Sequence, residues 1–509
     1  MSQIGVLLLF LSVVGCTSVQ AMRREEVNFD YVDAEATRLA AVPFRPQSAP
    51  PAALQELSYS EYQRIQFRHE DEIWKHDGLP FTVGFKHLGY LFNDRVNIHE
   101  FTATHAQEVE YLPTFFDFGG LEFPRPLPDD LDYAGLNLAI YDEGLQNYRQ
   151  FATFLGASYF RAIGAGMHYG TSARGATVNA GLGDPEEFPK FTRFWLGKPQ
   201  GTDRQLRIYA LLDGPSVTGA YEFILRSSGT TTIQVRARLH LREDVQSLGI
   251  APLTSMFWRG ENRAPEHSDF RPEVHDADGL VLQGEGKPAY WRPFDLDAKT
   301  RLSYFELNHP TYFGLMQRDR DFASYQDLEA HYQDRPSVWI EPKNDWGEGR
   351  VRLVELPTHW EYDDNIVAFW EPDQLPRQGE SLDVGYTIHW STETAPPAHP
   401  GLRVRSTRSG ADTAYPGTHV FVLEFGRELP VPTAPGESAP GPAPAVVAVV
   451  DGPSTLEDSR IAWNPYLQTW RVTLRVSSPT ADAEAIELKC HLESPEEGAS
   501  ETWAYQWTP

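Results

Sequence analysis

Cysteine is nearly absent from this sequence, whose 509 residues include only Cys16 and Cys490. Cys16 lies in an N-terminal segment typical of a removable signal, so we expect no disulfide in the mature chain and a buried, inert thiol at Cys490. Two cysteines also exclude a cysteine metal site, and the histidines lack the spacing of any recognised metal motif. No glycine-rich phosphate loop is present either. We therefore expect neither a metal nor an organic cofactor.

Positive charge is scarce as well. The chain has 44 Lys and Arg residues against 71 Asp and Glu residues, which gives a formal net charge of -27. Such a chain repels the phosphates of nucleic acid and anionic lipid surfaces, so nucleic acid is not expected as a partner. A neutral polymer such as a glucan meets no such repulsion. The 13 Trp and 22 Tyr residues offer flat faces that suit sugar rings.

A long hydrophobic run is missing too. The apolar stretch Ile4–Val14 has the length of a signal-peptide core and is too short to cross a bilayer. We predict a signal peptide over residues 1–21 and export of the mature chain. Two cleavage sites remain open: Val13–Cys16 resembles a bacterial lipobox, which would make Cys16 a lipid anchor, whereas Val19–Ala21 fits ordinary cleavage.

The rest of the sequence is dominated by β patterning. Segments such as Leu206–Leu212 and Thr232–Leu239 alternate apolar and polar residues, or form apolar runs closed by turn residues. Helices are expected at 59–67, 144–155 and 324–332. Because the strands follow one another too closely for helical crossovers, we predict an all-β protein with a sandwich or barrel architecture.

Length and composition divide the chain into two domains. After the strand pattern Val384–Trp390, residues 391–400 have the Thr, Pro and Ala content of an inter-domain linker. The first domain then covers residues 22–390. Residues 401–509 have the size and strand pattern of an immunoglobulin-like sandwich without its disulfide.

Several ordered strings within the first domain carry a specific resemblance. They are Ser158–Met167, Tyr169–Gly170, Ser172–Gly175, Pro252–Phe257, Gly260–Asn262, Arg271–Pro272, His275–Asp276, Gln317–Phe322, Arg335–Pro342, Asp345–Gly347 and Asp364–Trp370. Together these strings resemble the periplasmic glucan biosynthesis family known as OpgG/MdoG and OpgD. The apolar run is not preceded by a twin-arginine motif, which favours the G-type branch over the D-type branch.

The resemblance implies both a fold and a function. The fold would be a large mutarotase-like β-sandwich with a long cleft, followed by an immunoglobulin-like sandwich. The function would be the biosynthesis or processing of osmoregulated β-glucans in the periplasm. In the D-type branch it implies a glycoside hydrolase that cleaves β-1,2-glucan with inversion.

Inverting cleavage needs one carboxylic acid to protonate the leaving oxygen and one carboxylate to activate water. By resemblance, Asp364 matches the general acid and Asp276 matches the presumed base. Taken alone, Asp364 has the context of a turn residue before a strand, and Asp276 that of an Asx turn. Asp278 is the rival of Asp276 for the role of base.

Aromatic and arginine side chains in the same strings are candidates for sugar binding, although core packing and salt bridges are their commoner uses. Aromatic rings stack on sugar rings, and guanidinium groups donate several hydrogen bonds to hydroxyls or hold carboxylates. The candidates are Tyr159, Tyr169, Trp258, Trp291, Arg174, Arg271, Arg318 and Arg320.

One stretch departs from the family pattern. Relatives resemble Gly-Glu-Trp-(Ile or Ala)-Trp-Arg-Pro, whereas this chain has Pro288 and Ala289 in place of the Glu and first Trp. Two functional hypotheses therefore stay open. The chain is either an enzyme that hydrolyses or transfers β-1,2-glucan, or a non-catalytic glucan-binding scaffold that partners an inner-membrane glucosyltransferase.

Overall fold

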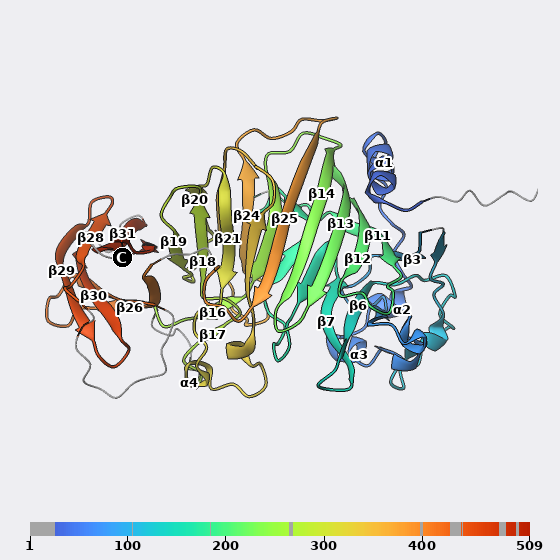
Figure 1. Cartoon of the computed structure of the whole chain (residues 1–509), viewed down its shortest axis with the longest axis horizontal. Coiled ribbons are helices and arrows are strands. Elements are labelled where there is room, and N and C mark those ends of the chain that lie inside the picture. Colours follow the sequence, from blue (N-terminus) through green and yellow to red (C-terminus); the bar gives the residue numbers. More distant parts are fainter. Residues whose placement is uncertain are drawn as a thin grey trace, which may run out of the picture.

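The computed structural model describes residues 26–103, 105–183, 185–263, 268–397, 401–427, 439, 441–477, 485–494 and 498–508. The described chain is built mainly of β-strands arranged in sheets, so the predicted all-β sandwich class is confirmed. Figure 1 shows a large two-layered sandwich in the middle, the C-terminal strands at one end and the N-terminal segments at the other. The predicted signal peptide, including Cys16, lies outside the described residues.

Within the described residues, the first sheet of the sandwich has ten strands in the order β2-β6-β7-β8-β9-β15-β24-β23-β20, with β10 paired to β15. Its strands are β2 (Phe81–Lys86), β6 (Gly135–Asp142), β7 (Asn147–Leu155), β8 (Tyr159–Ala162), β9 (Ser172–Arg174), β10 (Ala176–Val178), β15 (Leu248–Ser255), β20 (Arg301–Glu306), β23 (Gly349–Glu355) and β24 (Ile366–Pro372).

The second sheet has fifteen described strands in the order β28-β31-β33-β19-β18-β21-β22-β25-β14-β13-β12-β11-β3-β4, with β32 paired to β31. Its strands are β3 (Asn97–Phe101), β4 (Ala106–Glu108), β11 (Lys190–Gly197), β12 (Leu206–Asp213), β13 (Val217–Ser227), β14 (Thr231–Leu241), β18 (Gly279–Gly284), β19 (Tyr290–Pro293), β21 (Pro310–Met316), β22 (Ser337–Pro342), β25 (Ser381–Ser391), β28 (Ala445–Val450), β31 (Ile486–Ser494), β32 (Gly498–Ala499) and β33 (Thr502–Trp507).

Smaller elements complete the described chain. A four-stranded sheet contains β26 (Arg403–Ala411), β27 (Thr418–Gly426), β29 (Thr455–Asn464) and β30 (Thr469–Ser477), and two short pairs are β1 (Gln66–Phe67) with β5 (Phe116–Asp117) and β16 (Phe257–Arg259) with β17 (Val274–His275). The helices are α1 (Phe29–Ala40), α2 (Ala52–Gln55), α3 (Tyr59–Tyr62) and α4 (Phe322–Tyr325), and the single 3₁₀ turns are η1 (His69–Asp71), η2 (Lys75–Asp77), η3 (Pro113–Phe115) and η4 (Tyr332–Asp334).

Alternating side chains build the core of the sandwich. Along β14, Ile233, Val235 and Ala237 are buried while the residues between them face outward, as expected for a strand with one face on a core. Aromatic rings from the two sheets meet there; the ring centroids of Phe154 on β7 and Phe223 on β13 lie 5.3 Å apart. The strand pattern seen in the sequence therefore corresponds directly to the core.

Strands β18 and β21 contribute side chains to two hydrophobic cores. Leu280, Leu282 and Phe313 point into the sandwich, whereas Val281 and Tyr312 point the opposite way and pack against C-terminal side chains. Both faces of these strands are therefore buried, which explains why β18 has a continuous apolar run in the sequence.

The second sheet continues into the C-terminal part without a break. Strand β33 pairs in parallel with β19, with Thr502 opposite Tyr290 and Trp503 opposite Trp291. Cys490, on the neighbouring strand β31, is buried as predicted, and burial raises the pKa of its thiol to about 12. The described residues 392–397 form no strand. The domain boundary at 391–400 and the immunoglobulin-like identity of residues 401–509 stay predictions.

The structure corrects one predicted helix. Residues 144–146 belong to a tight turn, and 147–155 form the strand β7, which pairs with β6 across this turn. Asp142 makes this turn, because its Oδ1 accepts hydrogen bonds from the backbone N–H groups of Gly144 and Leu145 at 2.9 and 3.2 Å. Gln146, the last residue of the turn, has a φ angle of 50°, and a left-handed residue does not continue a right-handed helix.

The other two predicted helices are shorter than expected. The helix predicted at 59–67 ends at Tyr62, after a capping box formed by Ser58 and Glu61. The segment 324–332 is divided between α4 and η4, because Gln326 and His331 have φ angles of 57° and 49°. Left-handed residues end a right-handed helix.

Helix α1, which the sequence analysis missed, covers part of the outer face of the second sheet (Figure 1). Asn28 caps it by accepting a hydrogen bond from the N–H of Tyr31 at 2.9 Å. Its buried residues Phe29 and Val32 belong to the same hydrophobic cluster as Trp195 on β11.

A buried ion pair joins the segment after β21 to the residue before β33, two strands of the second sheet that are not neighbours. Nη1 and Nη2 of Arg318, just after β21, each donate to one carboxylate oxygen of Glu501 at 2.8 Å. The two side chains are 2% and 0% exposed. Arg318 also donates to the carbonyl of Val404 at 2.6 Å, and its guanidinium lies 3.6 Å from the ring centroid of Trp291.

The variant Glu501→Gln should lose roughly 3–5 kcal/mol of unfolding free energy, because the buried charge of Arg318 would lose its partner. Urea unfolding measures this loss. The control Lys198→Gln, which breaks an exposed pair with Asp77, should cost less than about 1 kcal/mol. Equal losses in the two variants would contradict the role given to Arg318.

Three carboxylates gather near the same junction. Oxygen atoms of Glu261, Glu273 and Asp319 all lie within 4.8 Å of one another. Burial raises the pKa of Glu261 to about 8, with the charges of Glu273 and Asp319 adding to the effect and Arg408 opposing it. Burial therefore favours the protonated form of Glu261 in the folded protein relative to the unfolded chain.

This raised pKa predicts a pH dependence of stability. The folded protein holds a proton that the unfolded chain releases above the ordinary value of 4.5, so the stabilisation falls as pH rises from about 4.5 to 8. Glu261→Gln should flatten that part of the curve of melting temperature against pH. The exposed control Glu143→Gln should leave the curve unchanged, and a wild-type slope in Glu261→Gln would contradict the prediction.

Candidate active site

Asp276 lies in the short connection between β17 and β18. Its backbone N–H donates to the carbonyl of Met256 at 2.8 Å, and its side chain is 9% exposed. Nη1 of Arg335 donates to Oδ1 of Asp276. The preceding residue, His275, pairs with Phe257 in the small sheet formed by β16 and β17. The backbone of Asp276 is therefore fixed at the end of a paired strand.

Asp364 lies two residues before β24, and its neighbour Asn365 anchors it. Asn365 is buried; its Oδ1 accepts from the N–H of Phe257 at 2.9 Å, and its Nδ2 donates to the carbonyl of Phe257 at 2.8 Å. Asp364 itself is 38% exposed, and Nη2 of Arg161 donates to its Oδ2 at 3.5 Å. The backbone of Phe257 therefore anchors both aspartates, although they are distant in sequence.

The two carboxylates are close enough to affect each other. Burial raises the pKa of Asp276, the ion pair with Arg335 opposes this shift, and the charge of Asp364 raises the pKa further. The charge of Arg161 also reaches Asp276. The structure thus brings together the predicted pair, with one carboxylate buried and the other exposed.

The alternation of β8 sets the aromatic surroundings of Asp364. Tyr159 and Arg161 point to one side of the strand, while Phe160 and Ala162 are buried on the other. Burial raises the pKa of Tyr159, and the charges of Arg174 and Asp364 act on the same hydroxyl. Tyr159 therefore lies near Asp364.

Tyr169 lies in the connection between β8 and β9, on the same side. Its hydroxyl accepts from Nε2 of Gln150 at 2.9 Å. Burial raises its pKa to about 12, against the influence of this hydrogen bond and of Arg161. Tyr159 and Tyr169 thus share Arg161 as a neighbour.

Arg174 does not reach solvent. It is 1% exposed, and its Nη2 donates to Oε1 of Glu186 at 2.6 Å. The guanidinium lies 5.0 Å from the ring centroid of Tyr159 and 4.8 Å from that of Phe188. Arg174 therefore packs against the ring of Tyr159 and does not present its N–H groups to a ligand.

Arg271 is held by three carboxylates. It pairs with Asp269, Asp327 and Glu361 at 2.9, 3.0 and 2.6 Å, and the hydrogen bond to Asp269 is the main cause of its raised pKa. The Trp258 ring centroid lies 5.9 Å from this guanidinium. Arg271 therefore fastens the loops around Trp258.

Three further predicted site residues, Trp291, Arg318 and Arg320, stabilise the surrounding structure. Trp291 is 4% exposed and its ring lies against the guanidinium of Arg318, which is paired with Glu501. Arg320 donates to the carbonyls of Gln333 and Arg335 and to the Ser337 hydroxyl. It thereby holds the backbone from which Arg335 reaches Asp276.

Asp278, the rival of Asp276, has a different environment. Its Oδ2 accepts from the backbone N–H groups of Arg318 and Asp319 at 3.0 and 3.2 Å. Burial raises its pKa to about 6, against the charges of His275 and Arg318. Asp278 thus binds backbone at the junction, whereas Asp276 lies beside Asp364.

The sequence analysis missed the two arginines that face the aspartates. Arg161 and Arg335 both lie in strings quoted for the family resemblance, but their spacing gave no sign of which carboxylates they bind. Tyr332 was missed as well; its ring centroid lies 4.3 Å from the Arg335 guanidinium, and the charge of Asp276 acts on its hydroxyl.

The segment that departs from the family pattern lies elsewhere. Lys287, Pro288 and Tyr290 line a cavity of about 580 Å³, together with Tyr304 and C-terminal residues such as Lys489. Its lining shares no residue with the described surroundings of Asp276 and Asp364. The substitutions therefore leave the aspartate pair untouched.

Comparison with known protein families agrees with these observations. None of the helices formed by the described residues is long and apolar enough to cross a membrane. The family model described as "Periplasmic glucan biosynthesis protein, MdoG" matches residues 27–507. This match covers nearly the whole chain, both aspartates and the C-terminal strands included, and the chain therefore belongs to the MdoG family of periplasmic glucan biosynthesis proteins.

Proposed function

We propose that the protein cleaves β-1,2-glucan with inversion, or transfers the cleaved chain to another sugar hydroxyl. The observation that carries the proposal is the pair Asp276 and Asp364, one buried and one exposed, anchored on the same backbone at Phe257. Two carboxylates in unlike environments are what acid and base roles require.

Asp364 acts as the general acid. Its partly exposed carboxyl can reach the oxygen of a bound glycosidic bond, whereas Asp276 is 9% exposed and cannot. Arg161 lies at 3.5 Å from Asp364, a distance at which it donates only a weak hydrogen bond. Asp364 is therefore free to exchange Arg161 for a substrate oxygen.

Asp276 acts as the general base for water. The guanidinium of Arg335 favours its ionised form, while burial raises its pKa from the ordinary value. A base gains proton affinity as its pKa approaches the working pH, provided that it stays ionised. Burial therefore raises the proton affinity of Asp276, and Arg335 favours its ionised form.

Sugar rings of the glucan would stack on Tyr159 and Tyr169. The two hydroxyls share Arg161 as a charged neighbour, which supports a subsite next to Asp364.

The alternative function is a non-catalytic scaffold that partners an inner-membrane glucosyltransferase. It was suggested by Pro288 and Ala289, which replace the Glu and Trp of the family pattern. The cavity that Pro288 lines lies apart from the aspartates, which favours the enzyme over the scaffold.

Asp364→Asn should lower glucan cleavage by about 10²- to 10⁴-fold, because an amide keeps the shape of the side chain but delivers no proton. Reducing-sugar release from linear β-1,2-glucan measures the rate. The matched control is Asp363→Asn, the exposed neighbour that accepts from the hydroxyl of Thr358, and it should keep most of the activity. Wild-type turnover in Asp364→Asn, or no cleavage by the wild type, would refute the catalytic proposal.

Asp276→Asn should cause a similar loss if Asp276 is the base, since an amide cannot accept the proton of water. Asp278→Asn is the matched control and should be milder, because the amide oxygen of Asn can still accept the hydrogen bonds that the backbone of Arg318 and Asp319 donates. Thermal melts of both variants exclude unfolding. A larger loss in Asp278→Asn than in Asp276→Asn would reverse the assignment of the base.

The mature protein should be periplasmic, either free or anchored by a lipid on Cys16. Cell fractionation with N-terminal sequencing tests this expectation. If Cys16 carries the lipid, Cys16→Ser should move the protein from the membrane fraction to the soluble periplasm. Native protein in the cytosol with Met1 still attached would refute export, and a Cys16→Ser variant that stays membrane-bound would refute the anchor.

A further inference from the structure

The cavity of about 580 Å³ that Pro288 lines runs along strand β20, and we call it the β20 cavity. One wall is the consecutive run from Leu302 to Asn308, most of which belongs to β20. The opposite wall comes from the second sheet and includes Tyr290 and Lys489. Figure 1 shows β20 at the end of the sandwich that adjoins the C-terminal strands. Small-molecule sites measure about 300–1,000 Å³, so the volume suits a ligand.

Strand β20 is the last strand of the first sheet and leaves one edge unpaired. Its described partner is β23 alone, and the N–H of Leu307 donates to the carbonyl of Gly349 at 2.8 Å. In an antiparallel pair, alternate residues point their backbone groups to opposite sides. The N–H and C=O groups of Leu302, Tyr304 and Glu306 therefore point away from β23. Within the described chain, no hydrogen bond reaches these groups.

Both ends of this free edge are closed by contacts with the second sheet. At the first residue of β20, Nη2 of Arg301 donates to the hydroxyl of Thr508, just after β33, at 3.1 Å. At the other end, a Cβ atom on Gly284 of β18 would lie 3.1 Å from the carbonyl oxygen of Asn308. An added peptide strand that continued along the edge would meet both contacts. A compact ligand therefore fits the β20 cavity better than an extended chain of protein.

The charged side chains that line the β20 cavity balance one another. Lys287 and Lys489 stand against Glu306 and Glu487. The ammonium groups donate hydrogen bonds, the carboxylates accept them, and the free edge of β20 does both. A hydroxyl group also donates and accepts. A neutral ligand rich in hydroxyl groups can therefore satisfy this lining without bringing in an unpaired charge.

Two tyrosine rings give the cavity apolar surface. Tyr304 is 49% exposed, Tyr290 is half-buried, and both line the space. The guanidinium of Arg352 lies 5.1 Å from the ring centroid of Tyr304 and supports that ring. Tyrosine combines a flat apolar face with a polar edge, which suits a sugar ring.

We propose that the β20 cavity binds a short stretch of neutral glucan, as a second site apart from Asp276 and Asp364. The free backbone groups of β20 hydrogen-bond to sugar hydroxyls, while Tyr290 and Tyr304 contact sugar rings. A polymer that engages two sites of one molecule binds more tightly than it would at either site alone. The inference rests on the role of the family in glucan biosynthesis and not on the proposed cleavage.

Titration calorimetry with a linear β-1,2-linked glucan oligosaccharide tests the proposal. The protein used is Asp364→Asn, which should leave the ligand uncleaved, and it should bind two oligosaccharides per chain. Adding Tyr290→Ile or Tyr304→Leu should weaken one of these binding events about three- to tenfold, because both changes keep apolar bulk but remove the flat ring. Tyr159→Ala should weaken the other event. The affinity of the cavity should be the same at low and high salt, since the ligand carries no charge.

The matched control is Tyr466→Leu, which removes a ring that is 69% exposed between β29 and β30 and should change neither event. Unchanged binding of both oligosaccharides in Tyr290→Ile and Tyr304→Leu would overturn the proposal. So would a single binding event that only Tyr159→Ala weakens, or loss of the cavity event at high salt. Displacement from the cavity by an extended peptide of alternating Thr and Val residues would assign the edge of β20 to strand addition instead. Failure of the proposed cleavage would differ, since the wild type would release no reducing sugar while the cavity event remained.

Discussion

The buried ion pair between Arg318 and Glu501 is the contact on which the arrangement of the molecule depends. It clamps the segment after β21 to the last strands of the chain, with the ring of Trp291 stacked on the guanidinium. The same segment gives two backbone N–H groups, those of Arg318 and Asp319, to Asp278. A buried charge that loses its partner is costly, so this junction tolerates little displacement.

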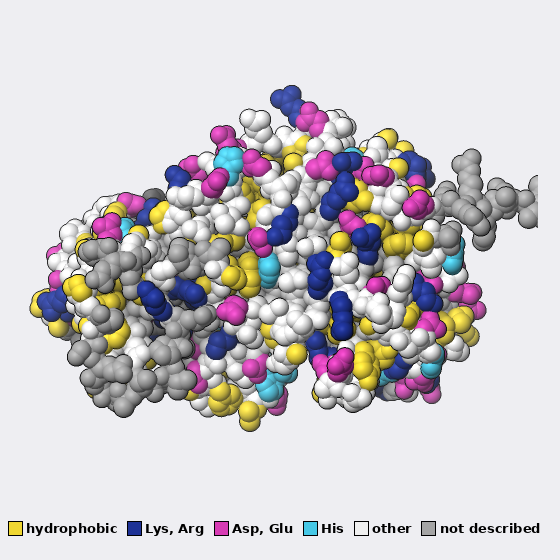
Figure 2. All heavy atoms as spheres, in the orientation of Figure 1, with side chains coloured by type: hydrophobic (Ala, Val, Ile, Leu, Met, Phe, Trp, Pro, Cys, Tyr) yellow, Lys and Arg dark blue, Asp and Glu magenta, His cyan; other side chains and the backbone are white. Residues whose placement is uncertain are grey.

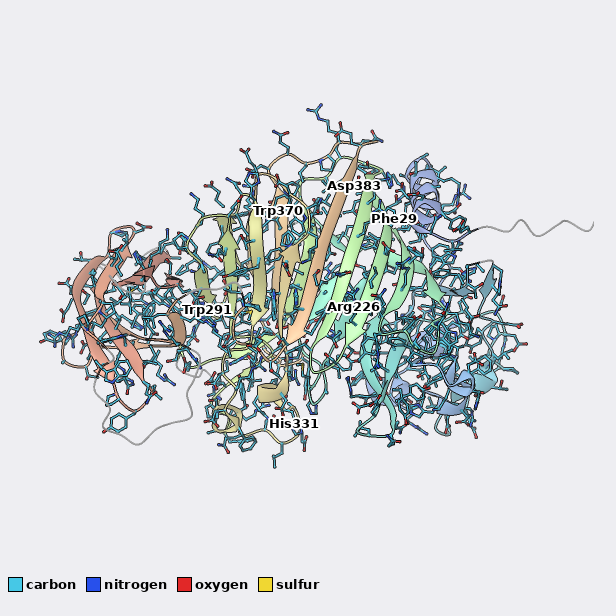
Figure 3. All side chains as sticks on the ribbon, viewed as in Figure 1. Phe29, Arg226, Trp291, His331, Trp370 and Asp383 are labelled. Carbon is cyan, nitrogen blue, oxygen red and sulfur yellow. The ribbon has the colours of Figure 1, made fainter. Side chains whose placement is uncertain are left out.

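The residues on either side of Arg318 carry this rigidity to the candidate site. Nε2 of Gln317 donates to the carbonyls of His275 and Tyr332 at 2.9 and 3.0 Å, and Arg320 donates to the carbonyl of Arg335. One short segment therefore fixes the residue before Asp276 and the residues around the arginine that binds it. Figure 2 shows a notch in the lower outline of the molecule, between the lobe with His331 (Figure 3) and the hairpin of β6 and β7. A segment fixed at this many points would hold the proposed acid and base in place.

The sequence predicted the strands well because period-two burial is a local signal, as on β14. It failed at 144–155, where the turn at Asp142 decided the structure. The family resemblance brought Asp276 and Asp364 together, which their spacing alone could not have done. It did not reveal that Arg318 pairs with Glu501, 183 residues away, because long-range partners leave no mark in a single sequence. From the sequence, arginines that could bind a sugar therefore could not be told apart from arginines that only support the fold.

Charge balance explains how an acidic protein keeps two carboxylates in one site. Each aspartate faces its own arginine, Arg335 for Asp276 and Arg161 for Asp364, although the chain as a whole carries a formal charge of -27. The two contacts are unequal: the pair with Arg335 is largely buried, and the contact with Arg161 is long and more exposed. A ligand that excludes water would strengthen every one of these interactions, while only Arg161 is placed to exchange its partner. In the proposed reaction a neutral polymer would therefore bind beside Asp364 without separating the pair of Asp276 and Arg335.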